Sequence, residues 1–362
     1  MHTDLAVKAK ATLENFVPVI DKRLAKYFDQ EINLNFGFNQ RQKSVVREML
    51  LHAKEHNLRP SKRLRASFVN YGYCLGGEKI NEKVWKAAMG VELVHTAILM
   101  HDDFMDGDNT RRGGPTTHKY YQDKAHNNAH YGISMAANIG DAIMSMGYEL
   151  TANCGFEENK VLPMMRNFFR TVVNTAYGQA YDITLELFPN WTENDVITLH
   201  QAKTSIYTYE NPLKVGAYLA GLPKETFPIL HDYAMDGGVA FQLQDDILGV
   251  FGTPEKTGKS ADSDLLQGKC TMLVLKVFND GTTGQQNAVR KVWGKLDASR
   301  KDLDNAKQAV IDSGSLKYSN DLAREYAAKA AEISSKLRNL NLNTESIDYI
   351  QGIAEYMVNR KV

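Results

Sequence analysis

The sequence predicts an all-α protein, and two observations support this fold class. The chain has 362 residues but only nine prolines, and none of them lies within 61–114, 116–162 or 255–362. In these stretches apolar residues recur at the i, i+3, i+4 and i+7 spacing of a helix, and no convincing strand-type alternation competes with that spacing. We expect one all-α domain over residues 1–362, because no repeat or flexible linker divides the chain.

Helical segments are expected in succession along the chain. The segment 84–100 is apolar over a wide arc, which is typical of a central helix. Further segments with helical spacing are 133–153, 163–187, 192–207, 228–250 and 322–337.

Local signals indicate where helices begin and where the chain turns. Thr192 followed by Asp195 is typical of a helix start, and Pro163 and Pro228 suit first-turn positions. Glycine and proline clusters indicate turns. The clusters are Gly76-Gly77, Gly113-Gly114-Pro115, Pro189-Asn190 and Gly221-Leu222-Pro223.

Composition argues against several classes of protein. The 43 basic and 43 acidic residues cancel, whereas a nucleic-acid-binding protein normally carries a basic excess. No apolar stretch of about 18 residues or more occurs, so we expect neither a membrane span nor a secretion signal. Cys74, Cys154 and Cys270 are scattered without metal-ligand spacing, which is typical of reduced thiols in a cytoplasmic protein.

The run HDDFMDGDNTRRGG, from His101 to Gly114, holds a dense group of candidate functional residues. Asp102 and Asp106 are four residues apart and share a helical face, with Asp103 beside them. A divalent cation relieves the repulsion among such carboxylates, and hard oxygen ligands favour Mg²⁺. The two arginines that follow, at 111 and 112, suit phosphate. The run therefore predicts a diphosphate site.

Two other interpretations of this run stay open on its residues alone. It could be a solvated acidic surface, although the helix dipole disfavours acids near a helix C-terminus. It could also be a phosphohydrolase site in which His101 and Asp102 bind a metal, with His95 nearby.

A second acidic pair, Asp245 and Asp246, precedes a glycine-containing loop. The position four residues after Asp245 is Gly249 rather than an acid. Two helices that each end in carboxylates followed by a cationic loop would form opposing halves of one cavity mouth. The charged residues of the second loop are Lys256, Lys259, Asp262, Asp264 and Lys269.

A basic run lies nearer the N-terminus. Ser61 is a candidate helix cap, and Lys62, Arg63 and Arg65 follow it. Free amides and the positive end of a helix dipole favour an anion at such a place. An ordinary solvated basic run is the alternative.

Two polar pairs interrupt otherwise apolar helices. Gln179 and Asp182 are three residues apart, and a polar pair facing a core needs partners or a metal. Lys203 and Thr204 repeat this theme one helix later. Either pair could instead face solvent.

With these motifs the sequence resembles the all-trans polyprenyl diphosphate synthases, which include farnesyl and geranylgeranyl diphosphate synthases. The resemblance extends from about Lys62 to Lys269, with the order of motifs preserved. It implies the type I isoprenoid synthase fold, a bundle of about ten or more helices around a central elongated cavity. The implied activity is Mg²⁺-dependent condensation of isopentenyl diphosphate with dimethylallyl, geranyl or farnesyl diphosphate, by a cytoplasmic homodimer.

The resemblance also implies roles for the matching residues. Three Mg²⁺ ions per site would be held by Asp102, Asp106, Asp182 and Asp245, with Asp103 and Asp246 in support. The allylic diphosphate would contact Arg111, Lys203, Lys259 and Lys269. The isopentenyl diphosphate pocket would contain Lys62, Arg65, His95 and Arg112, with Arg63 of the same basic run and the aromatic Phe241. Beside the reacting carbons and metals would lie Gln179, Thr204 and Gln242, with Asp264 on the loop over the second motif.

Two departures from the family pattern stand out. Pro60-Ser61 replaces the familiar Gly-Gly before Lys62, which would change how backbone amides approach the isopentenyl diphosphate. Gly249 replaces the last acid of the second motif, so this motif has fewer candidate ligands.

Product length is predicted from the turn before Asp102. Ala97 and Ile98 lie five and four residues before it, where farnesyl synthases of this family usually place an aromatic residue. We therefore expect a product longer than farnesyl, with geranylgeranyl diphosphate first and longer chains next. The alternative is that a bulky side chain of the Met144–Tyr148 turn forms the floor of the cavity and limits the product length.

Three alternative functions stay open: a farnesyl diphosphate synthase, a class I terpene cyclase and a non-catalytic prenyl-diphosphate-binding subunit of a heteromeric synthase. A cyclase would not need the second cationic pocket. Such subunits usually lose motif acids, whereas this chain keeps both pairs.

Overall fold

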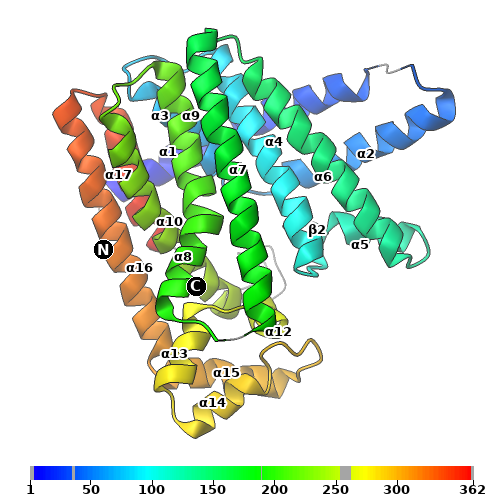
Figure 1. Cartoon of the computed structure of the whole chain (residues 1–362), viewed down its shortest axis with the longest axis vertical. Helices are drawn as coiled ribbons and strands as arrows, with labels where there is room; N and C mark the ends of the chain where they lie inside the picture. The colour runs from blue at the N-terminus through cyan, green and yellow to red at the C-terminus, as the bar shows by residue number, and fades with distance from the viewer. Residues whose placement is uncertain (1–3, 35–36, 189, 253–261, 360–362) are drawn as a thin grey trace.

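The computed structural model describes residues 4–34, 37–188, 190–252 and 262–359, and helices dominate it (Figure 1). The helices are α1 (Asp4–Ile32), α2 (Gln40–Leu58), α3 (Leu64–Cys74), α4 (Glu82–Met105), α5 (Thr117–Lys124), α6 (Ala129–Ala152), α7 (Glu158–Leu187), α8 (Glu193–His200), the π-helix η1 (Gln201–Glu210), α9 (Asn211–Ala220), α10 (Thr226–Phe251), α12 (Ser263–Gln267), α13 (Met272–Asp280), α14 (Thr283–Arg290), α15 (Arg300–Asp312), α16 (Ser315–Ser335), the 3₁₀-helix η2 (Lys336–Leu340) and α17 (Thr344–Val358). The all-α prediction is confirmed. The described strands are two pairs of residues, β1 (Thr110–Arg111) and β2 (Gly114–Pro115), which form a small antiparallel hairpin.

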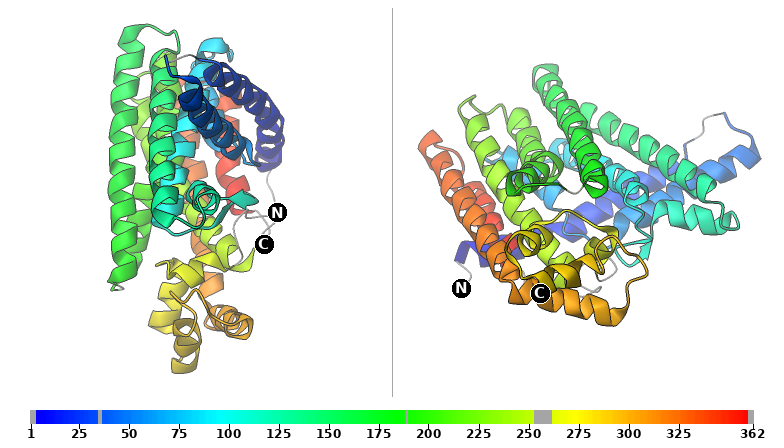
Figure 2. Two further views of the ribbon diagram at one scale, coloured as in Figure 1. Left: turned by 90° about the vertical axis from the view of Figure 1, so that its right-hand side faces the viewer. Right: turned by 60° about the horizontal axis from the view of Figure 1, so that its bottom comes forward.

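The long helices α4, α6, α7 and α10 stand side by side, and the smaller α13, α14 and α15 gather at one end of the molecule (Figures 1 and 2). Helix α4 is central as expected, since its residues from Val84 to Met100 are almost all buried. They pack in one apolar core with Phe168 of α7 and Tyr207 of η1. None of the described helices is long and apolar enough to cross a bilayer.

Helix boundaries follow the local signals in part. The Thr192 side chain accepts from the backbone of Asp195 and completes a capping box, so α8 begins as expected. Pro163 is not in a first turn, because α7 starts at Glu158 and runs through it. The helical segment expected over 192–207 is confirmed, but it changes from an α-helix to a π-helix after His200.

The expected cap at Ser61 is wrong as well. Helix α3 begins at Leu64, and its capping residue is Arg63, which has a left-handed backbone with φ +50° and ψ +33°. The left-handed residue Arg63 lies between Ser61 and the first helical residue, so Ser61 is not at the capping position. Ser61 Oγ lacks a hydrogen-bond partner.

Candidate active site

The first acidic motif lies at the C-terminal end of α4. Asp102 is in the last turn, and Asp106 caps the helix with its backbone N–H donating to Asp102 O at 2.8 Å. This arrangement places the two carboxylates on one face, as their spacing predicted. Carboxylates are unfavourable at the negative end of a helix dipole, so cations are needed to stabilise them here.

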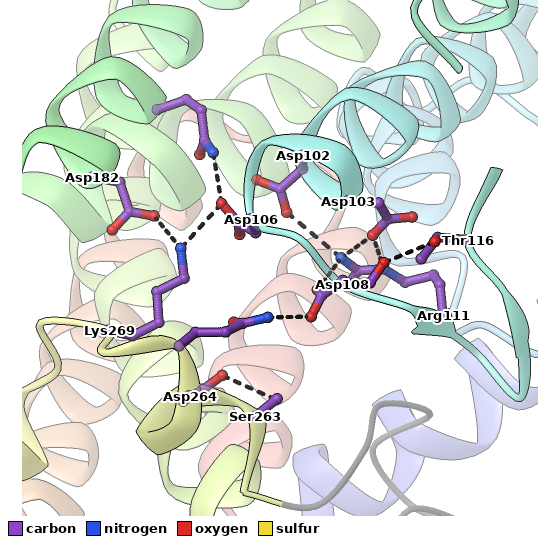
Figure 3. A network of polar contacts seen from close by, with 12 residues as sticks. Asp102, Asp103, Asp106, Asp108, Arg111, Thr116, Asp182, Ser263, Asp264 and Lys269 are labelled. Atoms are coloured by element: carbon purple, nitrogen blue, oxygen red, sulfur yellow. Dashed lines mark hydrogen bonds and ion pairs between the residues drawn. The ribbon is translucent and has the colours of Figure 1, made fainter. Parts of the chain in front are cut away.

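Two lysines from distant segments meet these carboxylates. Lys203 Nζ lies 3.1 Å from Asp102 Oδ1 and 2.8 Å from Asp182 Oδ2. Lys269 Nζ lies 3.0 Å from Asp106 Oδ1 and 3.4 Å from Asp182 Oδ2 (Figure 3). Helices α4 and α7, the π-helix and the segment after α12 therefore converge on one charged centre.

Gln179 joins the same centre, since its Nε2 donates to Asp106 Oδ1 at 3.0 Å. Gly178 allows the π-helix to approach α7 here, because a Cβ on it would lie 3.1 Å from the backbone nitrogen of Lys203. A π-helix inside a helical run often marks a functional site, and this one presents Lys203 and Thr204 to neighbouring helices.

A third carboxylate, Glu186, completes a cluster that fits a divalent metal. Oxygens of Asp106, Asp182 and Glu186 all lie within 4.8 Å of one another. Such hard oxygen donors fit Mg²⁺. Sequence reasoning missed Glu186, although it lies four residues after Asp182 on α7 and so repeats the spacing that indicated Asp102 and Asp106.

The charge balance of this cluster depends on the lysines. Burial and the neighbouring Asp102 raise the pKa of Asp106. Burial would also raise the pKa of Asp182, but Lys203 and Lys269 outweigh it and lower the pKa. Burial raises the pKa of Glu186, whose Oε1 lies 2.6 Å from Lys269 Nζ. The lysines thus favour the charged form of Asp182, whereas burial works against charge on Asp106 and Glu186, so a bound divalent cation would stabilise these two carboxylates.

Asp103 and Asp108 have a different task from Asp102. Both bind Arg111: Nε donates to Asp103 Oδ1 at 2.6 Å, and Nη2 donates to Asp108 Oδ2 at 3.1 Å (Figure 3). Burial opposes the charge of Arg111, but Asp103, Asp102 and Asp108 together raise its pKa. Asp103 itself is fully buried, so it fixes the arginine beside the carboxylate cluster.

The hairpin separates the two arginines. Arg111 lies in β1, and Arg112 begins the turn, where Arg112 and Gly113 have φ of +52° and +80°. Arg59 supports the hairpin by donating from Nη1 to the carbonyls of Arg111 and Pro115. Arg111 meets the carboxylates, whereas Arg112 lies near other arginines.

A second group of basic residues, called the basic pocket, consists of Lys62, Arg65, His95 and Arg112. Arg65 Nη2 donates to Thr208 Oγ1 at 2.7 Å, and Lys62 Nζ lies 5.9 Å from the centre of the Phe241 ring. The ring of His95 is 6.0 Å from that of Tyr207, over which Arg65 also lies.

The electrostatics of this pocket favour an anion. Burial and the positive charge of Arg63 lower the pKa of Arg112 to about 9, against a partial opposing effect of Glu92. Burial and the neighbouring Arg65 likewise lower the pKa of His95. Like charges held together out of water are stabilised by a bound anion such as a diphosphate.

The second acidic pair lies in α10 and is connected to the π-helix. Thr204 Oγ1 donates to Gln242 Oε1 at 2.6 Å, and Gln242 Nε2 donates to Asp246 Oδ1 at 2.9 Å. His200 Nε2 is 3.2 Å from the other oxygen of Asp246, a contact that sequence reasoning missed. Burial lowers the pKa of Arg65, and the charges of Glu92 and Asp245 are among those that partly offset this effect.

The four predicted metal ligands are brought together only in part. Among the described residues, the cluster of mutually close carboxylates contains Asp106 and Asp182, but neither Asp102 nor Asp245. Asp102 reaches the cluster through Lys203. Metal binding by any of the four stays a prediction.

Gly249 has a local physical reason. A Cβ at this position would lie 2.2 Å from Asp264 Oδ2, so Asp264 fills the space into which a side chain at 249 would project. The carboxylate of Asp264 therefore lies directly over the second motif. Lys256 and Lys259 fall outside the described residues.

The turn before Asp102 has a small buried side chain. Ala97 is fully buried, and Ile98 packs against the same core. The rings of Tyr148 and Phe168 are 5.3 Å apart in that core. The two places predicted to limit product length, the turn before Asp102 and the Met144–Tyr148 turn, thus lie among apolar side chains of α4, α6 and α7.

Comparisons with known proteins agree with this geometry. A family model described as Polyprenyl synthetase matches residues 47–310. A geranylfarnesyl diphosphate synthase of Aeropyrum pernix is 31% identical over 289 residues, which cover 79% of this chain and 86% of that protein. A geranylgeranyl diphosphate synthase of Saccharolobus solfataricus is 28% identical over 346 residues, or 93% of this chain and 98% of that protein. The crystal structure of a geranylgeranyl pyrophosphate synthase from Corynebacterium glutamicum, complexed with isoprenyl diphosphate and magnesium, superposes with a TM-score of 0.88 at 25% identity, covering 96% of this chain and 99% of that one.

Proposed function

Because the chain belongs to the polyprenyl synthetase family of prenyltransferases, we propose that it condenses isopentenyl diphosphate with an allylic diphosphate to give an all-trans product of geranylgeranyl length or longer. The observation that carries this proposal is that two consecutive arginines lie in different surroundings. Arg111 pairs with Asp102, Asp103 and Asp108 beside the carboxylate cluster, whereas Arg112 lies near Arg63 and Arg65. Each arginine would then serve a different diphosphate, as a condensation of two diphosphates requires.

The carboxylate cluster would hold the allylic diphosphate through metal. Asp106, Asp182 and Glu186 would be the Mg²⁺ ligands, joined by Asp102 and Asp245 when substrate brings them closer; we keep the expectation of three ions. Bound Mg²⁺ supplies positive charge against the charge that develops on the leaving diphosphate. Arg111, Lys203 and Lys269 add to it from fixed positions.

The surrounding residues would protect and orient the cation that forms on the allylic chain. The Thr204 hydroxyl and the Gln179 amide present dipoles, and the buried apolar side chains of α4 and α7 exclude water. Lys62, Arg65, His95 and Arg112 would hold isopentenyl diphosphate with its alkene toward the cation. The proton released after attack would pass to the departed diphosphate.

Product length is proposed from Ala97 and Ile98, since neither is aromatic. Geranylgeranyl diphosphate is the first candidate. The geranylgeranyl and geranylfarnesyl synthases among the relatives support a product longer than farnesyl.

We further propose a homodimer in the cytoplasm. Support for the dimer comes from one face of α7, where exposed apolar side chains follow helical spacing: Leu162, Phe169, Val173, Tyr177 and Tyr181. Three unpaired cysteines suit a reducing compartment. Sedimentation at equilibrium measures the dimer directly.

Incubation with Mg²⁺, farnesyl diphosphate and labelled isopentenyl diphosphate tests the function. Label in a longer diphosphate supports the synthase. A hydrocarbon made from farnesyl diphosphate alone would indicate a cyclase, and binding without turnover would indicate a subunit. A product that stops at farnesyl diphosphate when dimethylallyl diphosphate is the primer would indicate a farnesyl synthase.

A further inference from the structure

Arg63 has a backbone conformation that few residues other than glycine adopt. It immediately precedes α3 with φ +50°, in the left-handed region. Such a conformation persists where surrounding contacts hold it. The Arg63 side chain is only 1% exposed, so these contacts lie inside the protein.

The guanidinium of Arg63 is bound from three elements. Its Nε donates to Asp21 Oδ1 at 2.7 Å, and its Nη1 donates to Glu92 Oε2 at 3.3 Å. Its Nη2 donates to the carbonyl of Asn57 at 2.6 Å. Helices α1, α2 and α4 thereby hold one side chain, and each of its three nitrogens has a protein partner.

Glu92 binds the following helix as well. Its second oxygen, Oε1, accepts from the backbone N–H of Ala66 at 3.0 Å. That N–H belongs to the first turn of α3, where amides have no partner within the helix. One buried carboxylate thus fixes both Arg63 and the start of α3.

The turn held in this way determines where two pocket residues lie. Lys62 and Arg65 flank Arg63 in the chain, and they reach Phe241 and Thr208 respectively. A shift of the turn would move both cations relative to the rest of the basic pocket.

We propose that Arg63 is a positioning residue, whose bonds to Asp21 and Glu92 hold the left-handed turn that presents Lys62 and Arg65 to isopentenyl diphosphate. The proposal rests on the proposed function. It replaces direct diphosphate binding by Arg63 with an indirect role. It also gives the N-terminal helix α1 a part in substrate binding, through Asp21.

The test uses a residue that is remote from the diphosphate. Asp21→Asn keeps the side-chain volume and removes one ion pair of Arg63. We expect it to raise the KM for isopentenyl diphosphate roughly tenfold, because a displaced cation loses contact with its anion. The KM for the allylic diphosphate should stay within about twofold of wild type. Asp29→Asn is the matched control, since Asp29 is also on α1 and pairs with Lys54, and it should change neither constant.

A double variant tests whether Asp21 acts through Arg63. If Arg63 acts by holding the turn, Asp21→Asn should add nothing in an Arg63→Met background. Glu92→Gln should act in the same direction as Asp21→Asn, and it serves as the second variant if Asp21→Asn disturbs folding. Circular dichroism checks the fold of each variant.

Two results would overturn the proposal. One is an unchanged affinity for isopentenyl diphosphate in folded Asp21→Asn and Glu92→Gln when Arg63→Met weakens it. The other is full additivity in the double variant. Calorimetric binding of isopentenyl diphosphate gives the same comparison without turnover. Failure of the proposed function has a different signature, because wild-type protein itself would then neither bind nor incorporate isopentenyl diphosphate.

Discussion

Gln267 and Asp108 are joined by a hydrogen bond of 2.6 Å, from the side-chain amide to Asp108 Oδ1, although they are 159 residues apart in the chain. Asp108 also holds Arg111, and Lys269, two residues after Gln267, reaches Asp106. The bond therefore fixes the segment that carries Lys269 against the loop that carries Arg111. The two sides of the proposed allylic diphosphate site are connected through it.

Breaking this bond should weaken the site without removing a metal ligand. We expect Gln267→Leu to lower kcat/KM for the allylic diphosphate about tenfold or more, because a hydrogen bond to a charged partner is worth about 1.5 to 3 kcal/mol. Steady-state kinetics with varied allylic substrate measures the effect. Gln308→Leu removes a similar amide-to-aspartate bond on the surface of α15 and should be silent. Equal losses in both variants would contradict the connection.

Asp106 and Asp103 should differ in their response to Mg²⁺. Asp106→Asn removes a proposed Mg²⁺ ligand of the cluster, so we expect kcat to fall on the order of a hundredfold or more and the Mg²⁺ requirement to rise. Asp103→Asn weakens the hold on Arg111 and should chiefly raise the KM for the allylic diphosphate. Mg²⁺ titrations of initial rates measure both effects. A matching rise in the Mg²⁺ requirement for Asp103→Asn would argue against its role as a support for Arg111.

Ala97→Phe should shorten the product. The phenyl ring would enter the space below Asp102, so chain growth from dimethylallyl diphosphate should end near farnesyl length. Product chromatography of wild type and variant measures the change, and thermal unfolding checks the fold, since Ala97 is fully buried. An unchanged product distribution would indicate that product length is limited deeper in the protein, in the region of Tyr148.

Stability should fall as pH is lowered below neutrality. Burial lowers the pKa of His52 to about 4 from its usual 6.5. The unfolded chain then binds more protons than the folded one between these values, so the free energy of unfolding is highest above about pH 6.5 and decreases toward pH 4. The loss is at most about 3 kcal/mol for this residue. Urea unfolding at several pH values measures it, and His52→Gln should flatten the slope. A slope that His52→Gln leaves unchanged would assign the effect to other buried groups.

The fold and the first motif were predictable because they depend on short-range spacing. The i, i+4 separation of Asp102 and Asp106 and the Thr192 capping box both act within one helical turn. Glu186 could have been found by the same rule. The contact of Lys269 with Asp106 could be expected only through resemblance, because it joins segments far apart in the chain.

Other features depend on tertiary packing and were not predictable from local sequence. The left-handed turn at Arg63 exists because Asp21 and Glu92 bind its side chain, and no local signal names either partner. The π-helix after His200 likewise depends on close packing against α7. Gly249 departs from the family pattern, and only the position of Asp264 gives a reason for a glycine there.

The most direct measurement counts inorganic diphosphate released against labelled isopentenyl diphosphate incorporated, starting from dimethylallyl diphosphate and Mg²⁺. A site that holds two different diphosphates through Arg111 and Arg112 predicts one diphosphate released per isopentenyl unit added, and none without isopentenyl diphosphate. The label should end in a diphosphate of geranylgeranyl length or longer. Diphosphate release that does not depend on isopentenyl diphosphate would contradict this account.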